Sequence, residues 1–131
     1  MHLLDHVSIT VRSLSAVLRF YKATMSALGA VIAYEDKDAI GFGERNGPQN
    51  SGHSYVSVFQ SEHASADPRR HWCFRASSVS QVDAFHGAGL AAGGHDEGGP
   101  ALRDYHLGYY AAFLRDPEGN KVEAVFHHAG D

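Results

Sequence analysis

The chain has 131 residues, of which 44% are apolar and 20% are charged, so it is long enough for one globular domain with a real core. Its formal net charge of −4, with Arg69-Arg70 as the only adjacent basic pair, argues against a nucleic-acid partner, because phosphate binding needs a clustered basic surface. No apolar run reaches the length of a membrane span, no secretory signal pattern begins the chain, and the single Cys73 excludes an internal disulfide, so we expect a cytoplasmic protein.

The first half of the chain predicts a strand, a helix and further strands. Residues 6–11 alternate polar and apolar side chains, which is typical of a half-buried strand. An apolar stripe with steps of three and four then predicts a helix that ends at Gly29: Leu14, Leu18, Tyr21, Met25 and Leu28. Short strands are expected at 30–34, 39–43 and 54–59, and residues 44–53 form a Gly- and Pro-containing loop.

The second half repeats this order after a polar stretch, 61–70, that contains Pro68. A strand begins at His71, and Ser77, Ser78 or Ser80 is the expected N-cap of the next helix. Gly93-Gly94 ends that helix, and we expect a long loop from there to about residue 107. Strands at 109–115 and 120–126 follow, joined by an Asp-Pro-Glu-Gly-Asn turn.

The repeat predicts an α+β fold of two βαβββ modules in one domain, because a repeated unit usually cannot bury its apolar face alone. Module 1 covers about 1–60, the linker about 61–70 and module 2 about 71–131. His6 and His71 begin equivalent strands, and the last strand carries Glu123. Two imidazoles and a carboxylate on strands are a suitable donor set for a divalent metal ion.

Two segments carry a family resemblance. One is His6–Val11 followed by Phe20-Tyr21 and Leu28-Gly29; the other is Phe113–Glu123, in which the acidic turn leads into the last strand. Together they resemble the vicinal oxygen chelate superfamily, which includes glyoxalase I, fosfomycin resistance thiol transferases, extradiol dioxygenases and bleomycin-binding resistance proteins. The resemblance covers nearly the whole chain. It implies paired modules whose curled mixed sheets form a metal-binding cleft.

The resemblance also implies a ligand set. Carried over by position, it makes His6, His71 and Glu123 the ligands of a divalent ion, which could be Mn, Fe, Ni or Zn. The fourth ligand of glyoxalase I falls on Ser57, which is a poor metal ligand, and Glu62 is an unlikely substitute. We expect a homodimer, in which the cleft forms either within one chain or between His6 of one protomer and His71 of the partner subunit.

Several functions agree with this set. The leading one is a glyoxalase-like metalloenzyme that acts on a small oxygen-chelating substrate by metal-assisted electrophilic catalysis. A fosfomycin-resistance-type thiol transferase shares the three ligands, but no Arg or Lys follows Glu123 here. An extradiol-type dioxygenase is a further alternative, although those chains are usually longer. A metal-free antibiotic-binding protein is the alternative from another class, and such members usually lack the ligands.

Candidate substrate-binding residues lie on strands and on the expected loop. Tyr55 and Ser57 share one strand face, and Tyr109 and Phe113 share another, although aromatic residues on strands more often form core. In the loop, Arg103 could bind an anionic substrate group, and Tyr105 or His106 could move protons if the loop acts as a lid. A solvated surface loop is the more common role for such a segment.

Overall fold

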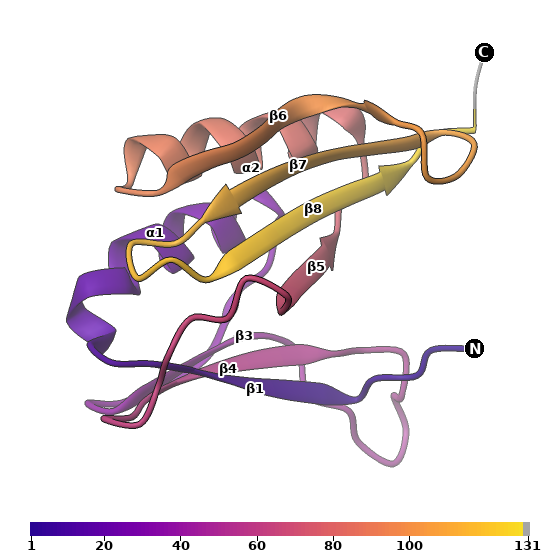
Figure 1. Ribbon diagram of the computed structural model, residues 1–131. Coiled ribbons are helices and arrows are strands. Elements are labelled where there is room, and N and C mark those ends of the chain that lie inside the picture. Colours follow the sequence, from indigo (N-terminus) through magenta and orange to yellow (C-terminus); the bar gives the residue numbers. More distant parts are fainter. Residues whose placement is uncertain (130–131) are drawn as a thin grey trace. The chain divides into compact units, whose positions relative to one another are not determined.

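The computed structural model describes residues 1–129 and confirms the α+β fold with two mixed four-stranded sheets (Figure 1). The chain divides into two compact units, one formed by Met1–Ser15 and Ala30–Ser65 and the other by Ala16–Gly29 and the residues from Ala66 onward. No helix among residues 1–129 is long and apolar enough to cross a membrane. The elements in chain order are β1 (His6–Val11), α1 (Leu14–Ala27), β2 (Ile32–Glu35), β3 (Ala39–Gly43), β4 (Tyr55–Gln60), β5 (His71–Arg75), α2 (Val79–Ala91), β6 (His95–Arg103), β7 (Tyr109–Arg115) and β8 (Lys121–His127).

The sheet of the first unit has the order β1-β4-β3-β2, with β1 parallel to β4 and the other pairs antiparallel. The period-two pattern of β1 buries Ile9 and Val11 on one face, as predicted, where they join apolar residues of β3 and β4. His6 lies on the opposite face. On that face Gly41 has no side chain because the ring of Tyr34 occupies the space in which a Cβ would lie.

The sheet of the second unit has the order β5-β8-β7-β6, again with one parallel pair, β5 and β8. Both helices cover one face of this sheet, which leaves the other face to form the site (Figure 1). Phe20 of α1 is fully buried and packs against Gly94, where a Cβ would lie 2.5 Å from its ring, while a Cβ at the neighbouring Gly89 would collide with Leu114. Of the three serines expected as possible caps of α2, the structure selects Ser78, whose hydroxyl accepts a hydrogen bond from the backbone of Gln81 at 3.1 Å.

The turn between β7 and β8 is organised by the buried carboxylate of Asp116. It accepts hydrogen bonds from the Tyr21 hydroxyl at 2.6 Å and from the backbone N–H groups of Glu118 and Asn120 at 2.8 and 3.0 Å. Burial, together with the negative charge of Asp116, raises the pKa of Tyr21 well above its ordinary value. The same carboxylate therefore fixes the turn before β8 and anchors α1 to it.

The prediction of a long loop at residues 94–107 is wrong, because most of that segment forms β6. This strand pairs antiparallel with β7 through two register shifts around Gly98, whose φ of +148° an L-residue rarely adopts. It is an edge strand, so Pro100 removes no essential ladder hydrogen bond. Gly and Pro concealed the strand from pattern analysis, and the true loop is limited to residues 104–108.

Candidate metal and substrate site

The open face of the second sheet carries a histidine–carboxylate pair. Glu123 lies in β8, flanked by Cys73 of β5 and Phe113 of β7, and is only 2% exposed. Its Oε1 lies 3.0 Å from His71 Nε2, and its Oε2 accepts a hydrogen bond from the Tyr109 hydroxyl. Both oxygens of a buried carboxylate therefore have a defined partner, as a buried charge requires.

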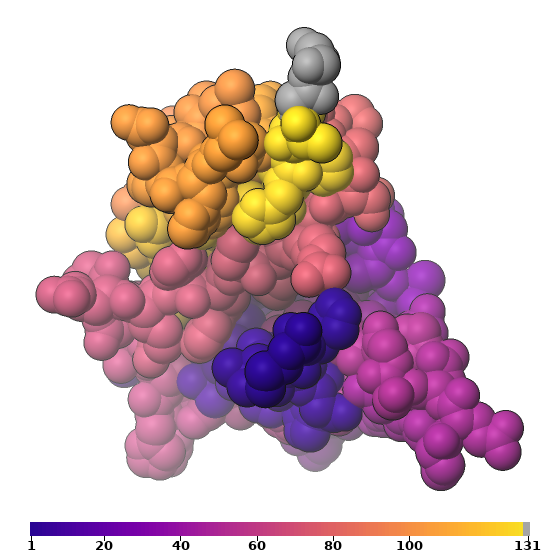
Figure 2. All heavy atoms as spheres, turned by 90° about the vertical axis from the view of Figure 1, so that its right-hand side faces the viewer, coloured from indigo at the N-terminus to yellow at the C-terminus, as the bar shows by residue number. Residues whose placement is uncertain are grey.

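A pocket of about 340 Å³ opens over this pair. His71, Glu123 and Lys121 are polar residues that line it, and Tyr109, which also lines it, packs against a buried apolar cluster that includes Phe113. The loop after β6 forms its rim through Tyr105 and His106, whose rings lie 5.2 and 5.8 Å from that of Tyr109. Figure 2 shows this loop beside the end of β8, where His128 N–H donates to the Gly108 carbonyl at 2.7 Å.

Two groups next to Glu123 have altered acidity. Partial removal from water and the neighbouring carboxylate raise the pKa of the Cys73 thiol to about 12. Partial burial and the hydrogen bond to Glu123 raise the pKa of the Tyr109 hydroxyl as well. Both groups are therefore protonated at neutral pH, and the Tyr109 hydroxyl donates to the carboxylate.

His6 lies in the first unit, where neighbours fix its ring. Its Nδ1 is 2.7 Å from Asp5 Oδ1, and Asn46 donates to the other Asp5 oxygen at 2.7 Å. The hydrogen bond from His6, followed by that from Asn46, lowers the pKa of Asp5. The ring stacks on Tyr55 at 4.8 Å with 9° between planes, and the side chain is half-exposed. With Nδ1–H bonded to a carboxylate, Nε2 carries the free lone pair, which is the usual arrangement of a metal-binding histidine.

Strand register supports the equivalence between Ser57 and Glu123. Ser57 pairs with the residue two after His6, and Glu123 pairs with the residue two after His71. Ser57 is 4% exposed, and its Oγ accepts a hydrogen bond from Tyr34 at 2.7 Å. The first unit therefore has a hydrogen-bonded hydroxyl where the second has a carboxylate.

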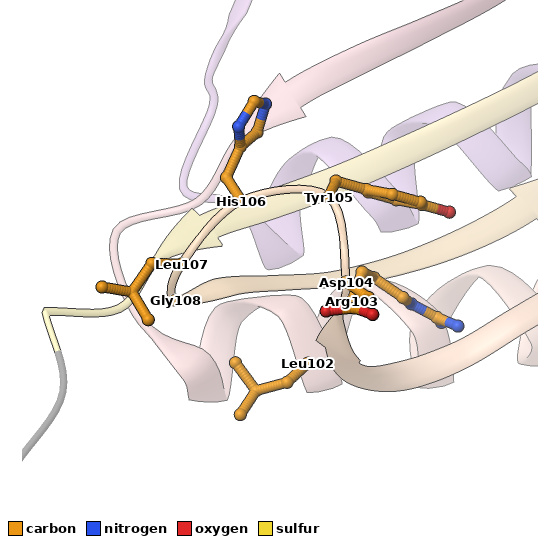
Figure 3. A pocket seen from close by; sticks show the side chains of 7 residues that line it. All are labelled: Leu102, Arg103, Asp104, Tyr105, His106, Leu107 and Gly108. Carbon is orange, nitrogen blue, oxygen red and sulfur yellow. The ribbon is translucent and has the colours of Figure 1, made fainter.

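The remaining sequence candidates lie around the loop of the second unit. A pocket of about 420 Å³ is lined by residues 102–108, and the side chains of Arg103 and Tyr105 extend to the same side of it while Leu107 points away (Figure 3). Two residues with clear roles were missed from the sequence. Asp5 orients His6, and Lys121 lines the Glu123 pocket; the available signals were a carboxylate adjacent to the histidine and the period-two spacing of Lys121 from Glu123.

The donor atoms of the second unit suit a divalent cation. Ligands bound at roughly 2.0–2.2 Å and at right angles lie about 3 Å apart, and His71 Nε2 and Glu123 Oε1 are 3.0 Å apart. Within residues 1–129 of one chain, His, Cys, Asp and Glu side chains form no group of three that could hold a metal ion. His71 and Glu123 thus form a donor pair, and His6 belongs to the other unit.

Comparison with known proteins agrees with this geometry. The family model of the Glyoxalase/Bleomycin resistance protein/Dioxygenase superfamily matches residues 3–124. The chain belongs to this superfamily. No curated protein matches the chain. Among solved structures of the superfamily, a glyoxalase/bleomycin resistance protein from Albidiferax ferrireducens T118 is 30% identical, with 95% of this chain and 98% of that chain covered and a TM-score of 0.77.

More distant superfamily structures share the fold. A glyoxalase-related enzyme from Fulvimarina pelagi is 15% identical, covers 96% of this chain and 88% of its own, and has a TM-score of 0.70. The fosfomycin resistance protein FosX from Mesorhizobium loti is 16% identical, with coverage of 98% and 95% and a TM-score of 0.64. At these identities the likeness extends to the fold of the superfamily and not to an activity.

Proposed function

We propose that the protein is a metal-dependent, glyoxalase-like enzyme that acts on a small oxygen-chelating molecule, with His6, His71 and Glu123 as the metal ligands. The observation that carries this proposal is the buried Glu123 carboxylate, which faces His71 at 3.0 Å inside a pocket. Among the described residues its ion-pair partner is this histidine and not a Lys or Arg. A carboxylate kept at 2% exposure with so weak a cationic partner suits a cation that binds from the pocket.

Two of the three proposed ligands, Glu123 and His6, have a neighbour that orients them. Tyr109 donates to Oε2 of Glu123 and leaves Oε1 directed at His71, and Asp5 holds Nδ1 of His6 so that Nε2 faces outward. A bound divalent ion would polarise the adjacent oxygens of a substrate and so stabilise negative charge that develops on them. Two imidazoles and one carboxylate suit Mn²⁺, Fe²⁺, Ni²⁺ and Zn²⁺, and they leave positions for substrate oxygens.

The loop residues are suited to the proton and solvent handling that such chemistry requires. Tyr105 and His106 stand at the rim of the pocket, against the ring of Tyr109. Here the His106 ring could accept or return a proton, and the aromatic rim would limit access of water.

Calorimetric titration of the protein with Mn²⁺, Ni²⁺ and Zn²⁺ tests this proposal. We expect one strong site per chain, and we expect that His6→Ala, His71→Ala and Glu123→Gln each weaken it by at least the roughly 10- to 100-fold typical of an outer-sphere change. His63→Ala is the matched control, because its side chain is 88% exposed and lies outside both pockets. A wild-type protein without a strong site, or variants that bind as tightly as the control, would instead favour the metal-free binding protein.

We also propose that the ligands come from two chains of a homodimer. In this case an equilibrated mixture of His6→Ala and His71→Ala proteins contains mixed dimers in which one intact ligand set is rebuilt. Metal binding then returns in the mixture although neither variant binds alone. If the ligands come from a single chain, the mixture binds no better than its components.

A further inference from the structure

We propose that Tyr105 is a specificity-determining residue, whose ring stacks on an aryl group of the substrate while the oxygens next to that group reach the metal ligands. The proposal rests on the function proposed above for the same pocket and names its substrate class. That class is a small molecule in which an aryl group is attached to an oxygen-bearing carbon.

The pocket over the ligand pair has walls that consist mainly of rings. Five of its seven lining residues carry a phenyl, phenol or imidazole ring: His71, Tyr105, His106, Tyr109 and Phe113. Glu123 lines the same pocket, so one ligand bound there can contact Tyr105 and also reach the metal ligands. A cavity of about 150 Å³ is large enough to bind benzene. Since this pocket has about 340 Å³, it has room for an aryl ring in addition to a small chelating group.

The neighbours of Tyr105 hold it in place before a ligand binds. Tyr109 is fixed at both ends, because its hydroxyl donates to Glu123 and its ring packs against a buried cluster that includes Ala111. The loop that carries Tyr105 closes onto this residue through the Tyr109 N–H group, which donates to the His106 carbonyl at 3.3 Å. Tyr105 therefore stands next to a fixed ring whose far end touches the proposed metal ligand Glu123.

The ring of Tyr105 has a face that the protein leaves open. Its centroid lies 5.2 Å from that of Tyr109, and the two ring planes meet at 76°. A contact at this angle covers at most one face of the Tyr105 ring, and the residue is 60% exposed. Figure 3 shows that its side chain extends away from the loop on the side opposite to Leu107.

An exposed aromatic face favours a flat apolar partner over a small aliphatic one. Removal of the ring surface from water is favourable in proportion to the area buried, and aromatic pairs gain further from stacked or edge-on contact. An aryl group that enters the pocket makes both gains against Tyr105. A substrate with only a methyl group in the same position would reach the metal ligands but leave most of the Tyr105 ring in water.

The test uses metal-free protein and three neutral diols, so that neither the metal nor a ligand charge determines the outcome. ¹⁵N-labelled protein is titrated with phenylethylene glycol, cyclohexylethylene glycol and propylene glycol, and amide shifts are followed in β7, β8 and the loop between β6 and β7. We expect the phenyl compound to bind at least about tenfold more tightly than propylene glycol. We expect the cyclohexyl compound to bind more weakly than the phenyl compound, because it is apolar but cannot stack as a flat ring.

Variants assign the preference to one ring. Tyr105→Ala should lose most of the tenfold preference for the phenyl compound, and Tyr105→Phe should retain it, because the stacking face is unchanged. Leu107→Ala is the matched control, since it truncates an exposed apolar side chain of the same loop that lies outside this pocket. Equal binding of the phenyl and propylene compounds, cyclohexyl binding as tight as phenyl binding, or a Tyr105→Ala protein that behaves like the control would overturn the proposal. A wild-type protein that prefers the phenyl compound but binds no metal would refute only the function proposed above.

Discussion

Replacement of Glu123 by glutamine should have opposite effects on the metal-free and the metal-loaded protein. The amide has the shape of the carboxylate, so it can accept from the Tyr109 hydroxyl and donate to a ring nitrogen of His71, but it carries no charge. Since the side chain is 2% exposed, removal of the charge also removes a desolvation cost. We therefore expect the metal-free variant to unfold at the same temperature as the metal-free wild type, or at a higher one.

The metal-loaded protein should show the reverse order. A metal ion at 100 times its dissociation constant stabilises the folded wild type by about 2.7 kcal/mol. For a chain of this length that corresponds to roughly 10 °C in midpoint, and Glu123→Gln should lose nearly all of it. Thermal unfolding followed by circular dichroism, with and without chelator, measures both arms. Glu123→Ala serves as the contrast, since it leaves the Tyr109 hydroxyl without its acceptor and should cost about 1–3 kcal/mol even without metal. A Gln variant that is destabilised without metal and still gains the full metal shift would refute the assignment.

Three further predictions concern residues that support the fold or the site. Tyr21→Phe removes the hydroxyl that donates to Asp116 and should lower the free energy of unfolding by about 1–3 kcal/mol at neutral pH. Because the folded-state pKa of Tyr21 is raised, this advantage of the wild type is present below about pH 10 and declines above it. Unfolding midpoints of both proteins, measured from pH 8 to 11, should therefore draw closer together as the pH rises. Asp5→Ala removes the carboxylate that holds the ring of His6 and should weaken metal binding about 10- to 100-fold. Calorimetric titration measures this change, and an unchanged metal affinity would contradict the orienting role of Asp5. Gly108→Ala places a Cβ against a backbone carbonyl at φ +73° and should lower the unfolding midpoint by several degrees, whereas an unchanged midpoint would show that the loop rearranges freely.

Regular alternation and motif spacing made much of the fold predictable. Both sheets share one plan, in which the first strand pairs in parallel with the last, and this matches the repeat that begins at His6 and His71. The apolar stripe of α1 was predictable, and the cap of α2 could be narrowed to three serines, because helix periodicity and capping are local properties. β6 was missed because an edge strand can tolerate Gly and Pro, and its pairing with β7 depends on tertiary contacts that no local pattern records.

The candidate site residues could be named from the sequence, but the side chains that surround them could not. The pattern singled out Glu123, and the structure adds the Tyr109 hydrogen bond, the burial and the 3.0 Å approach of His71. Nothing in the sequence revealed that the ring of Tyr105 meets that of Tyr109, because this contact depends on how the loop folds back onto β7. Such relations depend on strand register and on side-chain direction, and both follow from the folded sheet.

Paramagnetic broadening by Mn²⁺ tests the central claim most directly. Less than one equivalent of Mn²⁺ is added to ¹⁵N-labelled protein, and the amide signals that disappear first identify the residues nearest to the ion. We predict that the signals of His6, His71 and Glu123 broaden together and that a chelator, which removes the Mn²⁺, restores them. Broadening confined to exposed histidines such as His63, with the signals of His71 and Glu123 unchanged, would contradict the account.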